Sequence, residues 1–125
     1  MEILLDTNFI LTSTKQKLDF FSLANELFDE NISWIIPKEV IEELKDLSKR
    51  KGEKERDKQA AKISLELLNK HKTKKVKLKG DTVDEGLVNY SNKHEIILAT
   101  LDKKLKSKAK SGTLTIRGKK NLILN

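Results

Sequence analysis

Short apolar runs alternate along this chain with segments whose apolar residues recur at helical spacing. Apolar runs over residues 2–5, 32–36 and 95–100 are typical of buried strands, and weaker runs lie at 76–78, 113–116 and 122–124. Strands that alternate with helices form βαβ units, and these build a mostly parallel sheet covered on both faces. We therefore expect an α/β fold, a three-layer α/β/α arrangement with a mainly parallel central sheet, in a single domain over residues 1–125.

The helical segments are expected at residues 18–30, 38–49, 54–69 and 82–93, with a short basic helix after Asp102. Pro37 suits the start of the second segment, and Gly52 separates it from the third. Thr82 and Glu85 have the spacing of a capping box, which predicts the start of the fourth. Residues 6–8, which follow the first apolar run, are expected to form a loop.

Composition excludes several classes of protein. The chain has no cysteine, so disulfides and zinc–thiolate sites are excluded. No run of about 18 apolar residues is present, and the first residues lack the basic and apolar regions of a signal peptide. We therefore expect a cytoplasmic protein that does not contact a membrane.

The net charge is +7, and the basic residues are unevenly distributed. Residues 70–79 hold six lysines and no acid, and the segment from residue 103 onward holds eight Lys or Arg and no acid. Such segments suit a polyanion such as RNA. A solvated lysine-rich surface explains each of them equally well when it is taken alone.

Two of the predicted strands each lead into an aspartate, and these two aspartates lie far apart in the sequence. Asp6 follows the first apolar run, and Asp102 follows Ala99-Thr100-Leu101. In open parallel sheets, ligands bind beyond the carboxyl ends of the strands. Because aspartate is unfavourable inside strands, the two residues predict a site at this edge.

Helical geometry selects one glutamate from the segment over residues 38–49. Val40, Ile41, Leu44 and Leu47 form its apolar face, and Glu43 lies about 90° from the centre of that face. The other acids of the segment lie about 130–170° away and are expected to point to solvent: Glu39, Glu42 and Asp46. Glu43 can thus border the core and reach a shared site.

Helical geometry also selects Asp84 from the helix expected after Gly80. Asp84 lies about 65° from the centre of the apolar face, whereas Asp81 and Glu85 lie well over about 100° from it. Asp84 also falls in the first helical turn, where the helix dipole alone favours a carboxylate. Asp81 remains an alternative N-cap.

Four carboxylates gathered in one place repel one another strongly, and burial raises their pKa values. A hard divalent cation removes this conflict, and all-oxygen ligands indicate Mg²⁺ or Mn²⁺. Such an ion activates water and stabilises the leaving oxygen of a phosphodiester. Basic flanking segments would hold the polyanion.

The order of these motifs resembles the PIN-domain ribonuclease family over nearly the whole chain. The resemblance rests on Leu4-Leu5-Asp6-Thr7-Asn8, Val40-Ile41-Glu42-Glu43-Leu44, Val83-Asp84-Glu85 and Ala99-Thr100-Leu101-Asp102. It implies a metal-dependent endoribonuclease whose catalytic and metal-binding residues are Asp6, Glu43, Asp84 and Asp102. Asn8 would orient Asp6 through a hydrogen bond, and Thr100 would line the site. Lys104 stands where many relatives carry a further acid, so we expect at least one ion.

Within this family, the chain is similar to archaeal proteins of the pre-ribosomal-RNA-processing type and to VapC toxins. The resemblance implies a homodimer, and either an antitoxin or a pre-ribosomal partner. RNA binding is assigned to lysines of the basic C-terminal segment: Lys104, Lys106, Lys108, Lys119 and Lys120.

Two other functions remain open. The first is a PIN-like RNA-binding module that has lost catalysis. The second is a phosphoryl-transfer domain with a nucleophilic aspartate, although the chain lacks the second aspartate two residues after Asp6 and a glycine-rich phosphate loop.

Overall fold

One sheet of six strands forms the centre of the computed structural model, which describes residues 1–118 and 120–125. The strand order is β3-β2-β1-β4-β5-β6, and only the β5–β6 pair is antiparallel. This confirms the mainly parallel sheet. The strands are β1 (Glu2–Leu5), β2 (Ser33–Pro37), β3 (Thr73–Val76), β4 (Ile97–Ala99), β5 (Thr113–Arg117) and β6 (Asn121–Leu124).

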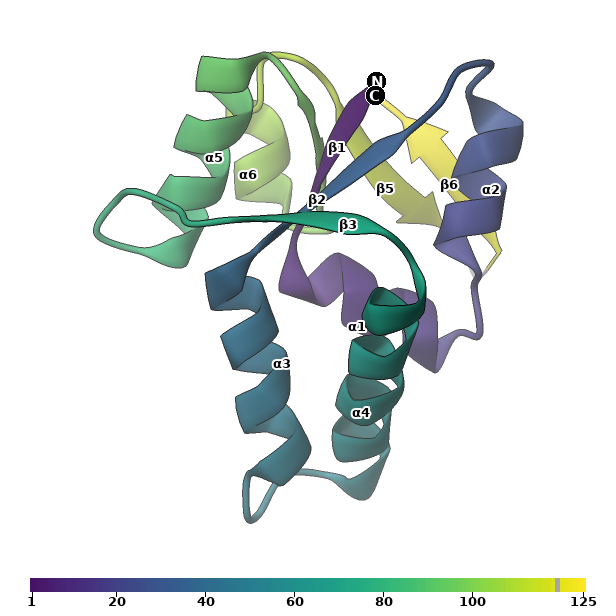
Figure 1. Ribbon diagram of the computed structural model, residues 1–125, viewed down its shortest axis with the longest axis vertical. Coiled ribbons are helices and arrows are strands. Elements are labelled where there is room, and N and C mark those ends of the chain that lie inside the picture. Colours follow the sequence, from purple (N-terminus) through teal and green to yellow (C-terminus); the bar gives the residue numbers. More distant parts are fainter. Residues whose placement is uncertain (119) are drawn as a thin grey trace.

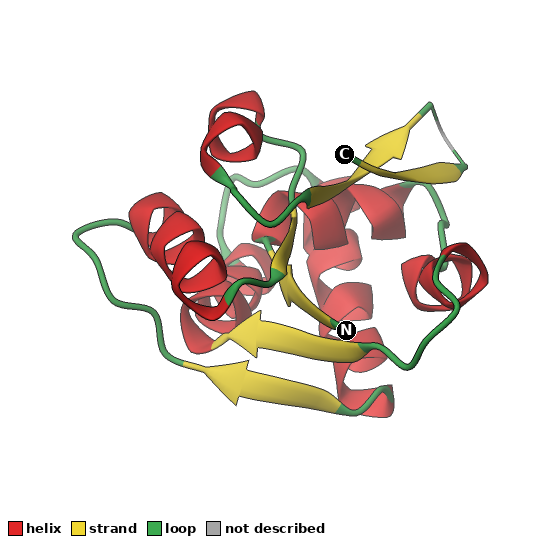
Figure 2. Cartoon of the chain, turned by 90° about the horizontal axis from the view of Figure 1, so that it is seen from above, coloured by secondary structure: helices red, strands yellow, loops and turns green. Residues whose placement is uncertain are grey.

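Helices cover both faces of the sheet, which confirms the three-layer α/β/α architecture (Figure 1, Figure 2). Four of them pack on one face: α1 (Thr7–Lys15), α2 (Phe20–Leu27), α3 (Lys38–Lys49) and α4 (Glu55–Lys70). The other face is covered by α5 (Val83–His94) and α6 (Lys103–Lys108).

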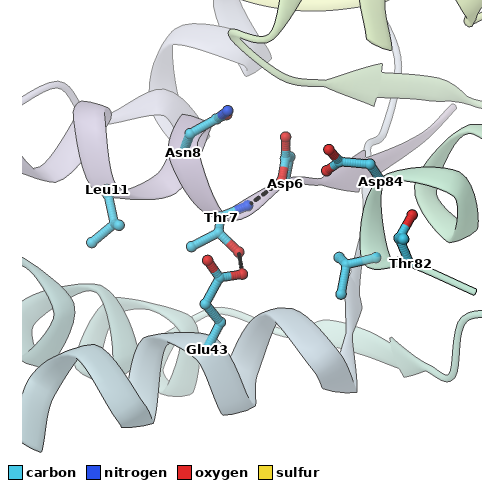
Figure 3. Close-up of a pocket in the computed structure, with 8 residues that line it drawn as sticks. Asp6, Thr7, Asn8, Leu11, Glu43, Thr82 and Asp84 are labelled. Atoms are coloured by element: carbon cyan, nitrogen blue, oxygen red, sulfur yellow. Dashed lines mark hydrogen bonds between the residues drawn. The ribbon is translucent and has the colours of Figure 1, made fainter. Parts of the chain in front are cut away.

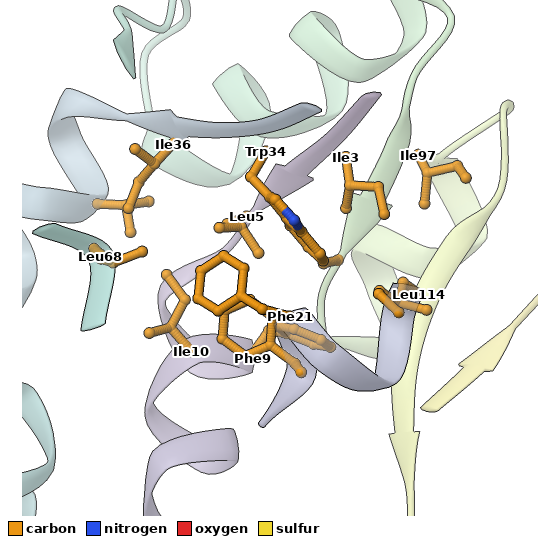
Figure 4. Packing of buried hydrophobic residues seen from close by; sticks show 14 of the residues in the cluster. Ile3, Leu5, Phe9, Ile10, Phe21, Trp34, Ile36, Leu68, Ile97 and Leu114 are labelled. Carbon is orange, nitrogen blue, oxygen red and sulfur yellow. The ribbon is translucent and has the colours of Figure 1, made fainter. Parts of the chain in front are cut away.

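The alternation of side chains along β1 explains how one short strand supports two cores. Ile3 and Leu5 pack among aromatic side chains of α1 and α2 and with Trp34 (Figure 4), whereas Leu4 packs with Leu87 on the opposite face. These three of the four β1 side chains are fully buried. Burial of each contributes about 1.5–3 kcal/mol, so the strand is held firmly at the centre of the sheet.

The structure corrects two expectations about local structure. Residues 7–15 form a helix rather than starting with a loop, because Asp6 caps the helix through Thr7 N–H while Phe9, Ile10 and Ser13 face the core. The strand expected at residues 76–78 lies earlier, at Thr73–Val76, where it pairs with β2 at the edge of the sheet. The structure confirms that residues 38–49 form a helix and that Thr82 is the N-cap of α5.

Parallel pairing places several chain reversals at one edge of the sheet. Leu5 and Ala99 are paired in adjacent strands, so the residues that follow them, Asp6 and Thr100, lie side by side. α3 begins directly after β2 at the same edge. In the described part of the chain, no helix combines the length and apolar character needed to span a membrane.

Candidate acidic site

Asp6 is held at the carboxyl end of β1 by hydrogen bonds to every part of the residue. Its backbone N–H donates to the carbonyl of Ala99 (3.0 Å). One carboxylate oxygen accepts from the N–H of Thr7 and the other from the hydroxyl of Thr100, both at 2.7 Å. The side chain is therefore fixed in orientation, and the residue is only 6% exposed.

Burial raises the pKa of Asp6 from 3.8 to about 6, because the carboxylate loses its hydration. The hydrogen bonds from Thr100 and Thr7 oppose this rise, and the negative charges of Asp84 and Glu43 add to it. Asp84 and Glu43 thus lie close enough to repel the Asp6 carboxylate. A cation bound between them would relieve this repulsion.

Glu43 reaches the site from α3 and is linked to the start of α1 through Thr7. The Thr7 hydroxyl donates to Glu43 Oε2 at 3.0 Å and the Thr7 N–H donates to Asp6, so the first residue of α1 bonds to both carboxylates. Glu43 itself is exposed, in contrast to the buried Asp6. Its carboxylate can therefore move without disturbing the core.

Asp84 approaches from the first turn of α5, and its carboxylate points toward that of Asp6 (Figure 3). Three of the predicted acids, Asp6, Glu43 and Asp84, line one pocket of about 400 Å³. The pocket is open to solvent and spans the gap between the two helical layers. The other lining residues are Thr7, Asn8, Leu11, Thr82 and Val83.

Asp102 lines a second pocket of about 220 Å³, which it shares with Asp84. Its carboxylate caps α6 by accepting from the N–H groups of Lys104 and Leu105, and its own N–H donates to the Thr100 hydroxyl. Thr100 therefore links Asp102 to Asp6. The structure brings three acids around one pocket and the fourth into the adjoining one. Their action as a single catalytic set stays a prediction.

Asn8 has a different partner from the one that the family resemblance implied. Its side-chain oxygen accepts from the N–H of Leu101 at 3.2 Å, and among the described residues the Thr100 hydroxyl, not the Asn8 amide, donates to Asp6. Asn8 thereby joins α1 to the loop that carries Asp102. Thr100 is fully buried, which makes its hydroxyl a fixed donor.

The acids expected outside the site also have defined positions. Glu42 is exposed, and neither it nor Asp81 lines a pocket described above. Glu85 lines only the second pocket. The expectation that Glu39 points to solvent is wrong, because this side chain is half-buried. Its carboxylate accepts a hydrogen bond from the N–H of Leu78, where the loop after β3 crosses the start of α3.

The lysines assigned to RNA binding divide by position. Lys104 and Lys108 line the second pocket beside Asp84 and Asp102. Lys106 lies on the same helix but does not line this pocket or the acidic one. Lys120 is exposed next to the β5–β6 turn, and Lys119 lies outside the described residues.

The donors around the first pocket suit a hard divalent cation in kind, because all of them are oxygens and three are carboxylates. A cation there would offset the burial of the Asp6 carboxylate, which is the main cause of its raised pKa, and the added repulsion from Asp84 and Glu43. Within residues 1–118 and 120–125, however, no three acidic or histidine side chains are already arranged to hold one ion. Ion binding would therefore require side-chain movement, for which the exposed Glu43 has freedom.

Four residues that line the pocket were not predicted from the sequence: Thr7, Leu11, Thr82 and Val83. Thr7 contributes a hydrogen bond to Glu43, and its position beside Asp6 was the only available signal. Leu11 could have been found only by recognising α1, whose apolar side chains follow a helical period.

Comparison with known proteins gives consistent results. The "PIN like domain" family model matches residues 3–119. The curated protein "Ribonuclease VapC4" of Methanocaldococcus jannaschii is 28% identical over 116 residues, which cover 92% of this chain and 87% of that protein.

Solved structures show the same fold at lower sequence identity. The structure of "the PIN domain endonuclease Utp24" superposes with a TM-score of 0.78 at 22% identity, covering 99% of this chain and 90% of that one. VapBC2 from Rickettsia felis, bound to a DNA fragment, gives a TM-score of 0.59 at 17% identity and coverage of 86% and 92%. Since the family model matches most of its length, the chain belongs to the PIN-like domain family.

Proposed function

We propose that this protein is a metal-dependent endoribonuclease that hydrolyses RNA phosphodiesters at the acidic pocket. The observation that carries the proposal is the buried Asp6, held by Thr100 and Thr7 beside the carboxylates of Glu43 and Asp84. A buried carboxylate with a raised pKa is costly to keep, and such groups cluster at functional sites. The names of the relatives, a ribonuclease and an endonuclease, support this choice of reaction.

Asp6, Glu43, Asp84 and Asp102 are the residues that would hold the ion, which we propose to be Mg²⁺ or Mn²⁺. When bound, the ion would supply an activated water and would stabilise the leaving oxygen. Asp6 contributes a carboxylate whose orientation is fixed by Thr100 and Thr7. Glu43, which is exposed and bonded to Thr7, contributes a carboxylate that can adjust to the substrate.

Lys104 and Lys108 would bind the phosphates that flank the cleaved bond, because they line the pocket that adjoins the acidic one at Asp84. Positive charge is needed there, since a polyanion must approach three carboxylates. Lys106 and Lys120 would add to the surrounding positive field without reaching that pocket.

The named relatives bear on the biological role. We propose either pre-ribosomal RNA processing or a VapC-type toxin activity, with a pre-ribosomal or an antitoxin partner respectively, and with a homodimer as the assembly. The resemblances to Utp24 and to VapC4 support these two roles about equally.

A catalytically inactive RNA-binding module is the second candidate. It is favoured by the lack, among the described residues, of three acids already placed around one ion position. The two candidates differ in whether cleavage occurs at all, which an assay decides.

The test is cleavage of a mixed set of labelled RNA oligonucleotides in Mn²⁺ or Mg²⁺, with EDTA and Asp6→Asn as controls. We expect cleavage by the wild-type protein that disappears with EDTA and falls by at least about 100-fold with Asp6→Asn. RNA binding by Asp6→Asn should be unchanged or tighter, because a negative charge near the phosphate is lost. Binding without cleavage in any metal would establish the inactive module instead.

A further inference from the structure

The loop that follows β3 packs against α5 because one helical residue has no side chain. Gly86 is buried, and a Cβ added to it would lie 2.8 Å from the Leu78 Cβ. Leu78 is buried there, and its N–H donates to Glu39 of α3. The loop projects beyond the sheet and then returns to α5 (Figure 1, Figure 2), and this anchor fixes its start.

This anchor holds two exposed lysines, Lys77 and Lys79, on either side of the buried Leu78. They face the carboxyl-terminal half of α5 across a pocket of about 170 Å³, to which α5 contributes Lys93. No acid lines the pocket. In the described part of the chain, none of the three ammonium groups forms an ion pair. Their positive charge is therefore available to an anion.

The same pocket contains an aromatic pair and an amide. The rings of Tyr90 and His94 lie 4.2 Å apart between centroids and are tilted by 37°. Tyr90 is half-buried against the core, which fixes its ring, whereas His94 is exposed. Asn89 completes the lining with a side chain that both donates and accepts. Ammonium groups, an aromatic face and an amide together match the phosphate, base and base edge of a nucleotide.

The dimensions favour a polymer over a free nucleotide. A volume of about 170 Å³ is well below the roughly 300 Å³ of pockets that enclose a whole small ligand. Asn89 also lines the pocket that contains Asp102, and Asp84 joins that pocket to the acidic one. The three pockets thus lie in succession along α5, as contacts to one extended chain would require.

We propose that Lys77, Lys79 and Lys93, with Tyr90 and His94, form a second subsite that binds single-stranded RNA away from the acidic pocket. The lysines hold backbone phosphates, and the Tyr90–His94 pair stacks on a base. This inference rests on the proposed function, because it takes RNA as the ligand. It gives a role to Lys77 and Lys79, the last two lysines of the 70–79 run, whose function the sequence left open.

The test compares two charge-matched variants for binding of a fluorescent 12-nucleotide single-stranded RNA. Lys79→Gln/Lys93→Gln removes two charges from the pocket. Lys62→Gln/Lys70→Gln removes two exposed charges from α4, on the opposite face of the sheet. Anisotropy is measured in EDTA at several salt concentrations, so that the result does not depend on cleavage.

We expect the pocket variant to bind the RNA about tenfold more weakly than wild type. The slope of the logarithm of its binding constant against the logarithm of the salt concentration should fall in magnitude by about 1.4, because each lost phosphate contact on a single strand accounts for about 0.7. The α4 variant should stay close to wild type. His94→Ala, which changes an exposed side chain, should weaken binding at least about fivefold through lost stacking.

Equal RNA binding by the two lysine variants would overturn the inference. It would also be overturned if the pocket variant lost binding of AMP but kept that of the 12-mer, because the pocket would then serve a free nucleotide. Absence of cleavage by the wild-type protein bears on the proposed function alone. Pocket-dependent binding would in that case still support the subsite.

Discussion

Asp6 shows at the scale of one residue how a fold can keep a costly charge. The carboxylate is buried beside two others, and the Thr100 hydroxyl and the Thr7 N–H compensate for this by donating hydrogen bonds to it. The sequence predicted this residue because an aspartate at the end of an apolar run has no role in a strand. It did not predict the compensating donors, since their approach depends on the pairing of β1 with β4.

The raised pKa of Asp6 predicts how stability depends on pH without metal. Between about pH 4 and 6, the folded protein retains a proton that the unfolded chain, with a pKa near 3.8, releases. The free energy of unfolding therefore falls as pH rises through about 6, by up to about 3 kcal/mol from this group. Asp6→Asn removes this loss. Its stability relative to wild type should rise by about 2–3 kcal/mol from pH 4 to 7.5.

Urea unfolding at several pH values checks this expectation, with the exposed Asp81→Asn as the control. The control should show no comparable trend with pH. A difference between Asp6→Asn and wild type that stays constant from pH 4 to 7.5 would contradict the assignment of a high pKa to Asp6. Addition of Mn²⁺ should stabilise the wild-type protein more than Asp6→Asn.

At the scale of elements, helix starts and loop crossings decide which side chains meet. Helical spacing distinguished Glu43 from Glu42, and Glu43 lines the acidic pocket while Glu42 does not. It failed for Glu39, because a tertiary contact with Leu78 lies outside any single-helix pattern. It also gave no sign of α1, whose first turn carries the polar Thr7 and Asn8 before its apolar residues begin.

The contact between α5 and the loop after β3 predicts an unusual effect of one substitution. Alanine normally stabilises a helix interior by about 1 kcal/mol relative to glycine. At Gly86 the added Cβ would meet Leu78 Cβ at 2.8 Å and the Lys79 carbonyl at 3.3 Å. Gly86→Ala should therefore destabilise the protein by about 1–3 kcal/mol.

Thermal unfolding measures this effect, and Asn89→Ala is the matched change at an exposed position of the same helix. Asn89→Ala should be neutral or slightly stabilising. If Gly86→Ala also raised the melting temperature, the loop would have to lie away from α5.

The short helix α6 predicts a difference between lysines that look equivalent in sequence. Lys104 and Lys108 line the pocket shared by Asp84 and Asp102, whereas Lys103 and Lys110 are exposed outside it. Lys104→Gln/Lys108→Gln should weaken RNA binding about tenfold and make the binding constant depend less steeply on salt, with a slope that is smaller by about 1.4 in a plot of logarithms. Filter binding in EDTA should show a much smaller effect for Lys103→Gln/Lys110→Gln. Equal effects would indicate that these lysines act only through net charge.

At the scale of the whole molecule, the parallel sheet collects acids that are far apart in the chain. Alternation of strand and helix was sufficient to predict the layers and the edge at which Asp6 and Asp102 lie. The strand order was not predictable from that pattern, and neither was the place of β3. The two central residues of β3 are Lys74 and Lys75, and such a sequence is typical of a solvated segment. β3 is a strand because it pairs with β2 at the edge of the sheet.

The charge distribution is also a property of the whole molecule. A chain of net charge +7 keeps three carboxylates around its main pocket and places lysines in the pockets that follow it along α5. A polyanion is drawn to such a surface from a distance, and cleavage would then be confined to the acidic pocket.

The central claim, that the acidic pocket is a metal-dependent catalytic centre, is tested most directly by the adjacent glutamates of α3. Cleavage of one labelled RNA in Mn²⁺ is measured under single-turnover conditions for Glu43→Gln and Glu42→Gln, which remove the same charge from neighbouring exposed positions. The account predicts a loss of at least about 100-fold for Glu43→Gln and less than about twofold for Glu42→Gln. Equal rates for the two variants, or a larger loss for Glu42→Gln, would contradict it.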